Sequence, residues 1–147
     1  MKLLTAVTVL LLGVSSQANL RTFESDLCTM FPNGKWGHCC FEHDLHYWAG
    51  GLKERRNWAD RELRQCVRET GRKRIAEIMY MGVRLGHLSP IKLKSKRWGN
   101  AFLGKRKRYK QHTYEEIMMI VDELQHYDFG PELKNKLLDS LEYFVAE

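Results

Sequence analysis

Apolar side chains recur every three or four positions along most of this chain, which is the spacing of an α-helix. The pattern predicts helices over about residues 36–48, 56–69, 75–83 and 113–127, and a last helix that begins at Pro131. The alternating pattern of a half-buried strand is weak throughout. The sequence therefore predicts an all-α fold, in which two antiparallel helices are followed by a third helix and a C-terminal helical hairpin.

Turn and capping residues separate the predicted helices. Residues 32–34 (Pro-Asn-Gly) form a turn signal before the first helix, and Gly50-Gly51 ends it. A capping box at Thr113 begins the fourth helix, and Pro131 occupies the first position of the fifth. We expect these last two helices to form the hairpin, over residues 113–147.

The N-terminus has the pattern of a secretory signal peptide. Lys2 is the only charged residue among the first 18, and an apolar run over residues 3–14 is followed by small residues that end at Ala18. A run of this length is too short to span a bilayer, which needs about 20 residues. We therefore expect a signal peptide over residues 1–18, a single domain over 19–147, and a secreted or periplasmic protein. A buried core helix is the alternative interpretation of this segment.

All four cysteines follow the predicted cleavage site, at Cys28, Cys39, Cys40 and Cys66. An even number of cysteines in an exported chain favours two disulfides over free thiols. A bond between Cys39 and Cys40 is sterically poor, because neighbouring side chains point apart. Cys28 is therefore expected to pair with one of these two residues and Cys66 with the other, which leaves two connectivities open.

Positive charge is concentrated in a basic segment over residues 91–112. Without Lys2, residues 19–147 carry 23 Lys and Arg against 18 Asp and Glu, a net charge of +5. The basic segment holds nine of these cations and no acid, and aromatic side chains lie between them. Such a segment favours an anionic partner, and we expect contact with a phospholipid membrane surface and its anionic headgroups. The predicted contact residues are Lys96, Arg97, Trp98, Lys105 and Arg106.

The densest group of chemically active side chains lies on the first two predicted helices. In an antiparallel pair of helices, His43 can face Asp60 at nearly the same register at which Cys39 can face Cys66. A carboxylate would then orient one ring nitrogen of His43 and leave the other to accept a proton, as a general base requires.

These residues resemble a known family. The segment Cys-Cys-Phe-Glu-His-Asp-Leu-His-Tyr at 39–47 resembles the active-site helix of secreted phospholipases A2, whose pattern is Cys-Cys-x-x-His-Asp-x-Cys-Tyr. Asp60-Arg61 followed by Cys66 resembles the second catalytic helix. Leu27-Cys28-Thr29, with Pro32 and Gly34 following, is similar to the calcium loop of the short bacterial and fungal members. The resemblance covers about residues 27–67.

The resemblance implies calcium-dependent hydrolysis of the sn-2 ester of glycerophospholipids. His43 would activate a water molecule, Asp60 would orient His43, and Tyr47 would support Asp60 by a hydrogen bond. The implied calcium ligands are the Asp44 carboxylate and backbone carbonyls near Leu27, Thr29 and Phe31. The implied disulfides are Cys28–Cys40 and Cys39–Cys66.

Two positions depart from the family pattern together, because His46 and Ala59 stand where the family has a further disulfide. The calcium loop also lacks the glycine-rich run of animal members. One alternative is a catalytically inactive module of the same fold that binds lipid or protein. Others are a zinc site formed by His38, His43 and His46 with two cysteines, and a merely structural His43 beside a surface Asp44. Nucleic-acid binding is not expected of an exported protein.

Overall fold

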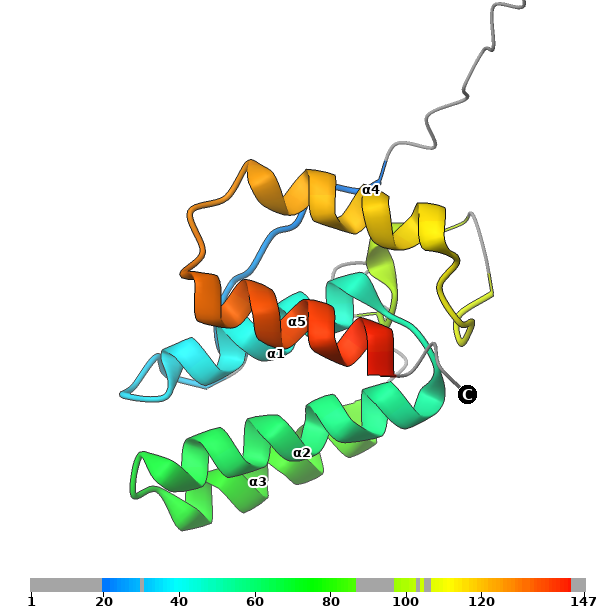
Figure 1. Ribbon diagram of the computed structural model, residues 1–147. Coiled ribbons are helices and arrows are strands. Elements are labelled where there is room, and N and C mark those ends of the chain that lie inside the picture. Colours follow the sequence, from blue (N-terminus) through cyan, green and yellow to red (C-terminus); the bar gives the residue numbers. More distant parts are fainter. Residues whose placement is uncertain (1–19, 30, 87–96, 103, 105–106, 144–147) are drawn as a thin grey trace, which may run out of the picture.

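The computed structural model describes residues 20–29, 31–86, 97–102, 104 and 107–143. Within these residues the chain forms five α-helices and one short 3-10 helix and contains no strand (Figure 1). The elements are α1 (Gly37–Ala49), α2 (Lys53–Glu69), α3 (Lys73–Gly86), η2 (Asn100–Phe102), α4 (Tyr114–Gln125) and α5 (Pro131–Tyr143). The predicted all-α fold, with antiparallel α1 and α2 and a C-terminal hairpin, is confirmed.

The ends of the helices follow the capping signals closely. Gly50 takes a positive φ of 76° directly after α1, and its amide donates to the carbonyl of His46. Thr113 caps α4 with a complete capping box, in which the Thr113 hydroxyl accepts from the Glu116 amide and the Thr113 amide donates to the Glu116 carboxylate. The helices α2 and α3 each extend beyond the predicted range, because no proline or cap interrupts them at the expected ends.

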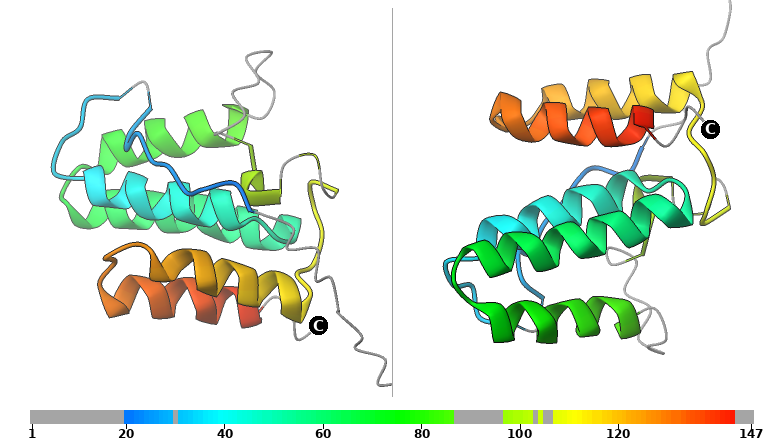
Figure 2. Two further views of the ribbon diagram at one scale, coloured as in Figure 1. Left: turned by 90° about the horizontal axis from the view of Figure 1, so that it is seen from above. Right: turned by 60° about the horizontal axis from the view of Figure 1, so that its bottom comes forward.

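The helix α1 is buried on two sides, and the C-terminal hairpin of α4 and α5 covers one of them. One side carries Leu45 and Trp48, which pack with Ile120 of α4 and with Leu137 and Leu141 of α5. The views in Figures 1 and 2 show the α4–α5 hairpin lying along α1 on the side away from α3. A second core joins α1 to α2 and α3, and it includes Cys39, Cys40, Leu63, Val67, Ala76 and Met79.

Two disulfides connect the elements around the second core, and both implied pairings are confirmed. Cys28–Cys40 ties the preceding loop to α1, and Cys39–Cys66 ties α1 to α2 with a Cα–Cα distance of 5.7 Å. Such bonds are compatible with a protein that reaches an oxidising compartment. Among the described residues, none of the helices has the length and apolar character needed to cross a membrane. The predicted signal peptide, residues 1–18, lies outside the described residues.

The buried guanidinium of Arg55 joins three parts of the fold. It donates to the backbone carbonyls of His46 and Gly50 at the end of α1, and to the Ser140 hydroxyl of α5 at 3.0 Å. It also lies over the ring of Trp98, 5.5 Å from the centroid. Burial lowers the pKa of Arg55 to about 9, so the side chain remains charged near neutral pH.

We expect Arg55→Ala to lower the free energy of unfolding by about 3 kcal/mol, because it leaves several buried acceptors without a donor. Arg61→Ala is the matched control, since Arg61 is exposed on the same helix, and its effect should stay within about 0.5 kcal/mol. Urea unfolding followed by circular dichroism measures both. Equal values for the two variants would show that Arg55 does not hold these elements together.

Candidate functional site

The structure brings His43 of α1 against Asp60 of α2. The His43 Nε2 atom lies 2.9 Å from Asp60 Oδ1, and the Tyr47 hydroxyl donates to the same oxygen at 2.8 Å. Asp60 is fully buried, and His43 is 8% exposed. An ionised carboxylate can only accept, so Nε2 carries the proton and Nδ1 is the ring nitrogen with a lone pair. The expected contact between positions 43 and 60 is therefore present in the geometry.

Two arginines that the sequence did not single out surround the other oxygen of Asp60. Arg84 of α3 donates to Oδ2 at 3.1 Å, and the Arg56 Nε atom lies 3.9 Å from it. Burial opposes ionisation of Asp60, but the bonds from His43, Tyr47 and Arg84 outweigh it and lower the pKa of this carboxyl. Arg56 could have been found from its position four residues before Asp60 on one helix. Arg84 could not, because its contact depends on how α3 packs against α2.

Contacts of both its ring and its hydroxyl hold the side chain of Tyr47 in place. Its ring packs 4.3 Å from the ring of His43 and 5.1 Å from that of Trp98, and its hydroxyl accepts from Arg56 Nε at 3.2 Å. Burial, together with the nearby Asp60 charge, raises the pKa of Tyr47, so it stays a hydrogen-bond donor across the whole physiological range.

The expected membrane contact of Trp98 is wrong. This side chain is 2% exposed, because its ring packs against Tyr47 and its Nε1 donates to the Gly51 carbonyl at 2.8 Å. Trp98 therefore supports the candidate site from within the fold. Of the other predicted contact residues, Arg97 is exposed. Lys96, Lys105 and Arg106 lie outside the described residues.

Asp44 lies next to the loop in which calcium ligands are expected. Its Oδ2 accepts from the Ser25 hydroxyl at 2.7 Å, and the Ser25 oxygen in turn accepts from the Leu27 amide at 3.0 Å. Leu27 has a φ of 62°, and its carbonyl accepts from the Thr29 amide. The Cys28–Cys40 disulfide tethers this loop to α1 one turn before Asp44.

The donor set around Asp44 suits calcium by its chemistry. The Asp44 carboxylate and the Ser25 hydroxyl beside it are hard oxygens of the kind that Ca²⁺ prefers. The hydroxyl of Ser25 was not predicted, and no spacing in the sequence indicates it. A second carboxylate of this loop, Asp26, accepts from the Thr29 hydroxyl at 3.0 Å. The expected ligand set therefore has Asp44 as its single carboxylate, which favours weak binding, because affinity rises with the charge of the ligands.

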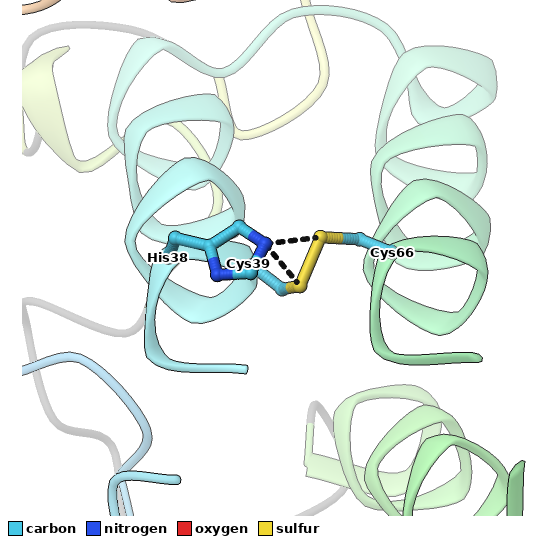
Figure 3. Close-up of side chains that lie close together, drawn as sticks. All are labelled: His38, Cys39 and Cys66. Carbon is cyan, nitrogen blue, oxygen red and sulfur yellow. Dashed lines mark hydrogen bonds between the residues drawn. A yellow bond between two sulfur atoms is a disulfide. The ribbon is translucent and has the colours of Figure 1, made fainter. Parts of the chain in front are cut away.

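His38, His43 and His46 do not come together as zinc ligands. Among the described His, Cys, Asp and Glu residues, the group with metal-like spacing is His38, Cys39 and Cys66 (Figure 3). The His38 Nε2 atom lies 3.4 and 3.5 Å from the two sulfurs, but these are bonded to each other. His43 contacts Asp60, and His46 Nδ1 lies 2.9 Å from the Arg55 guanidinium. The alternative of a zinc site at His38, His43 and His46 is therefore wrong, because these three side chains have different partners and the nearby cysteines are bonded in a disulfide.

His46 and Ala59 are the two positions at which the sequence departs from the phospholipase A2 pattern that it resembles. Both are fully buried, and the His46 ring packs edge-on against Trp58 at 4.9 Å. Burial lowers the pKa of His46 to about 4, so this ring is neutral at physiological pH. At these positions α1 and α2 are therefore joined by packing and by the contact of His46 with Arg55.

Glu42 links α1 to the C-terminal hairpin beside this position. Its Oε1 lies 2.6 Å from Lys136 Nζ, and Lys136 also contacts Glu62 of α2 at 3.0 Å. Burial opposes ionisation of Glu42, but His46 and Lys136 outweigh it and hold the pKa of this carboxyl at about 2.

Comparison with protein-family models, with curated proteins and with solved structures finds no match to this chain. The class of site is therefore defined by the structure alone, as a buried histidine–aspartate pair on a disulfide-linked helical hairpin, next to a loop rich in oxygen donors.

The lowered pKa of Glu42 predicts a pH-dependent contribution to stability. A carboxyl whose pKa falls from 4.5 to about 2 on folding stabilises the native state above pH 4.5 and loses this effect as the pH falls toward 2. We expect Glu42→Gln to cost about 2 kcal/mol at pH 7 and little near pH 2. Urea unfolding of both proteins across this pH range measures it. A cost that does not change with pH would assign the effect to packing.

Proposed function

We propose that this protein is a calcium-dependent hydrolase that cleaves the sn-2 ester of glycerophospholipids. The observation that carries the proposal is the buried contact of His43 with Asp60, with Tyr47 on the same carboxylate oxygen. A histidine oriented in this way is suited to general-base catalysis near neutral pH. The resemblance of residues 27–67 to secreted phospholipases A2 supports the choice of substrate.

The reaction needs one proton acceptor, and His43 fills this role. Its Nδ1 takes a proton from a water molecule while Asp60 holds the Nε2 proton and stabilises the imidazolium that forms. The hydroxide equivalent attacks the ester carbonyl, and the proton then passes from Nδ1 to the departing glycerol oxygen. The products are a fatty acid and a lysophospholipid, and His43 returns to its neutral form.

The Asp44 carboxylate would hold calcium with backbone carbonyls near Leu27, Thr29 and Phe31, and the Ser25 hydroxyl lies within reach of the same carboxylate. When bound, Ca²⁺ would supply a Lewis acid that polarises the ester carbonyl and stabilises the oxyanion. The Cys28–Cys40 disulfide and the Ser25 hydrogen bonds keep the loop beside Asp44, so the protein itself positions these oxygens.

The expected location is the periplasm or the extracellular space, where the two disulfides persist. The expected substrate surface is a phospholipid membrane, and nucleic acid is not an expected partner.

A second candidate function is a catalytically inactive lipid-binding module of the same fold. Arg84 and Arg56 favour it, because their positive charges lie 3.1 and 3.9 Å from Asp60 Oδ2. They offset part of the negative charge that would stabilise a protonated His43. The two functions differ in one measurement, the release of fatty acid.

We expect His43→Gln to reduce fatty-acid release from mixed phospholipid vesicles by at least about 10²-fold, because the variant removes the proton acceptor. His126→Gln is the matched control, since His126 is exposed at the end of α4, and it should keep full activity. Circular dichroism establishes that both variants fold. A folded wild-type protein that releases no fatty acid with calcium present would favour the inactive module instead.

Calcium binding should be weak, with a dissociation constant of about 10⁻⁴ to 10⁻³ M, because one carboxylate serves the site. Isothermal titration calorimetry measures this value, and Asp44→Asn should abolish the binding. Asp139→Asn, at an exposed position of α5, should leave it unchanged. Fatty-acid release that persists in excess chelator would remove Asp44 from its proposed role.

A further inference from the structure

The helix α3 exposes a row of large apolar side chains. Ile78, Met81 and Leu85 are each 55% exposed, and their spacing of three and four residues places them on one face of the helix. We call these three residues the α3 stripe. Other side chains of the same helix, Ala76 and Met79, are buried against α2. The α3 stripe is therefore apolar surface that the described core does not use.

The position of α3 leaves this row accessible. In the views of Figures 1 and 2 the helix lies at the edge of the molecule, beside α2 and far from the α4–α5 hairpin. Among the described residues, the only helix with extensive contacts to α3 is α2. A cluster of exposed apolar side chains in such a position is typical of an interaction surface.

Cationic side chains lie at both ends of the helix that carries the α3 stripe. Residues 72–74 (Arg-Lys-Arg) are exposed at the start of the helix, and Arg84, 34% exposed, lies near its end. The acidic side chain of α3, Glu77, is paired with Arg64 at 2.7 Å and with Arg68 at 3.6 Å on α2. Arg84 is paired with Asp60 and Glu77 with the two arginines, so the exposed unbalanced charges of this helix are the cations at its start.

The area and charge of this surface distinguish two possible partners, a second copy of the chain and a lipid surface. A stable dimer needs about 800 Å² from each partner, which three half-exposed side chains do not supply, and two cationic surfaces of the same chain would repel each other. An anionic lipid surface meets both features, since apolar side chains enter the acyl boundary while cations contact headgroups. We propose that the α3 stripe and its flanking cations dock this protein on an anionic phospholipid surface.

This docking surface adjoins the candidate site through Arg84. In sequence Arg84 lies between Met81 and Leu85 of the α3 stripe, and its guanidinium contacts Asp60. The inference rests on the proposed function for its choice of lipid. It assigns to the α3 stripe the membrane contact that was expected of Trp98, which is buried. Vesicle binding is a separate quantity from turnover, so the two proposals can fail independently.

The test is co-sedimentation of the full chain with vesicles of phosphatidylcholine containing phosphatidylglycerol, in excess chelator to suppress turnover. We expect the triple variant Ile78→Ser, Met81→Ser, Leu85→Ser to bind at least about tenfold more weakly than the wild type. The matched control is the double variant Tyr114→Ser, Met118→Ser, which removes exposed apolar side chains of α4 that are 76% and 46% accessible. It should bind as the wild type does. Both variants should retain calcium-dependent hydrolysis of a monomeric short-chain phospholipid.

A second variant addresses the charges without touching the apolar row. Lys73→Glu with Arg74→Glu should weaken binding to the anionic vesicles and leave the weaker binding to pure phosphatidylcholine unchanged. Vesicle binding by a wild-type protein that hydrolyses no lipid would support the docking surface while the proposed function fails. The docking surface is overturned if the wild type does not bind the anionic vesicles, or if the triple variant binds them equally well. It is also overturned if the α3 substitutions abolish only a dimer seen by analytical ultracentrifugation.

Discussion

The contact between His43 and Asp60 depends on the register of α1 against α2, and the Cys39–Cys66 disulfide holds that register. Cys39 lies one helical turn before His43, so a bond of fixed length near one end of the hairpin limits how far the two helices can slide. Arg55 secures the opposite end, where it binds the last carbonyls of α1. The candidate site lies between these two connections, and its geometry follows from both.

Burying Asp60 creates a requirement that the surrounding residues meet. A fully buried carboxylate is costly unless it accepts several hydrogen bonds, and here His43, Tyr47 and Arg84 donate to it. The same donors that make the charge tolerable also reduce its effect on the imidazole. The structure therefore combines a well-ordered histidine with a partly neutralised carboxylate, because the hydrogen bonds that stabilise Asp60 weaken its electrostatic effect on His43.

The sequence contained enough information for the fold class and for the contact of His43 with Asp60, but not for all of the surroundings of this contact. Helical periodicity and caps marked α1, α2, α4 and α5, because these signals are local in the chain. The cysteines and the two motifs then related α1 to α2. The contacts of Ser25 with Asp44 and of Arg84 with Asp60 could not be predicted in this way, because they join segments whose relative placement follows from tertiary packing.

Trp98 and the α3 stripe both show that the sequence pattern does not determine which apolar side chains are buried. An aromatic residue among cations suggested a membrane contact, yet Trp98 is buried against Tyr47. In α3, by contrast, the apolar side chains of Ile78, Met81 and Leu85 are half exposed. Periodicity shows which face of a helix is apolar, but it does not show which apolar positions a neighbour will cover. The helix α3 packs against α2 through Ala76 and Met79, and α2 leaves the α3 stripe uncovered. The lipid contact proposed for α3 rests on this uncovered apolar surface, which helical periodicity alone does not reveal.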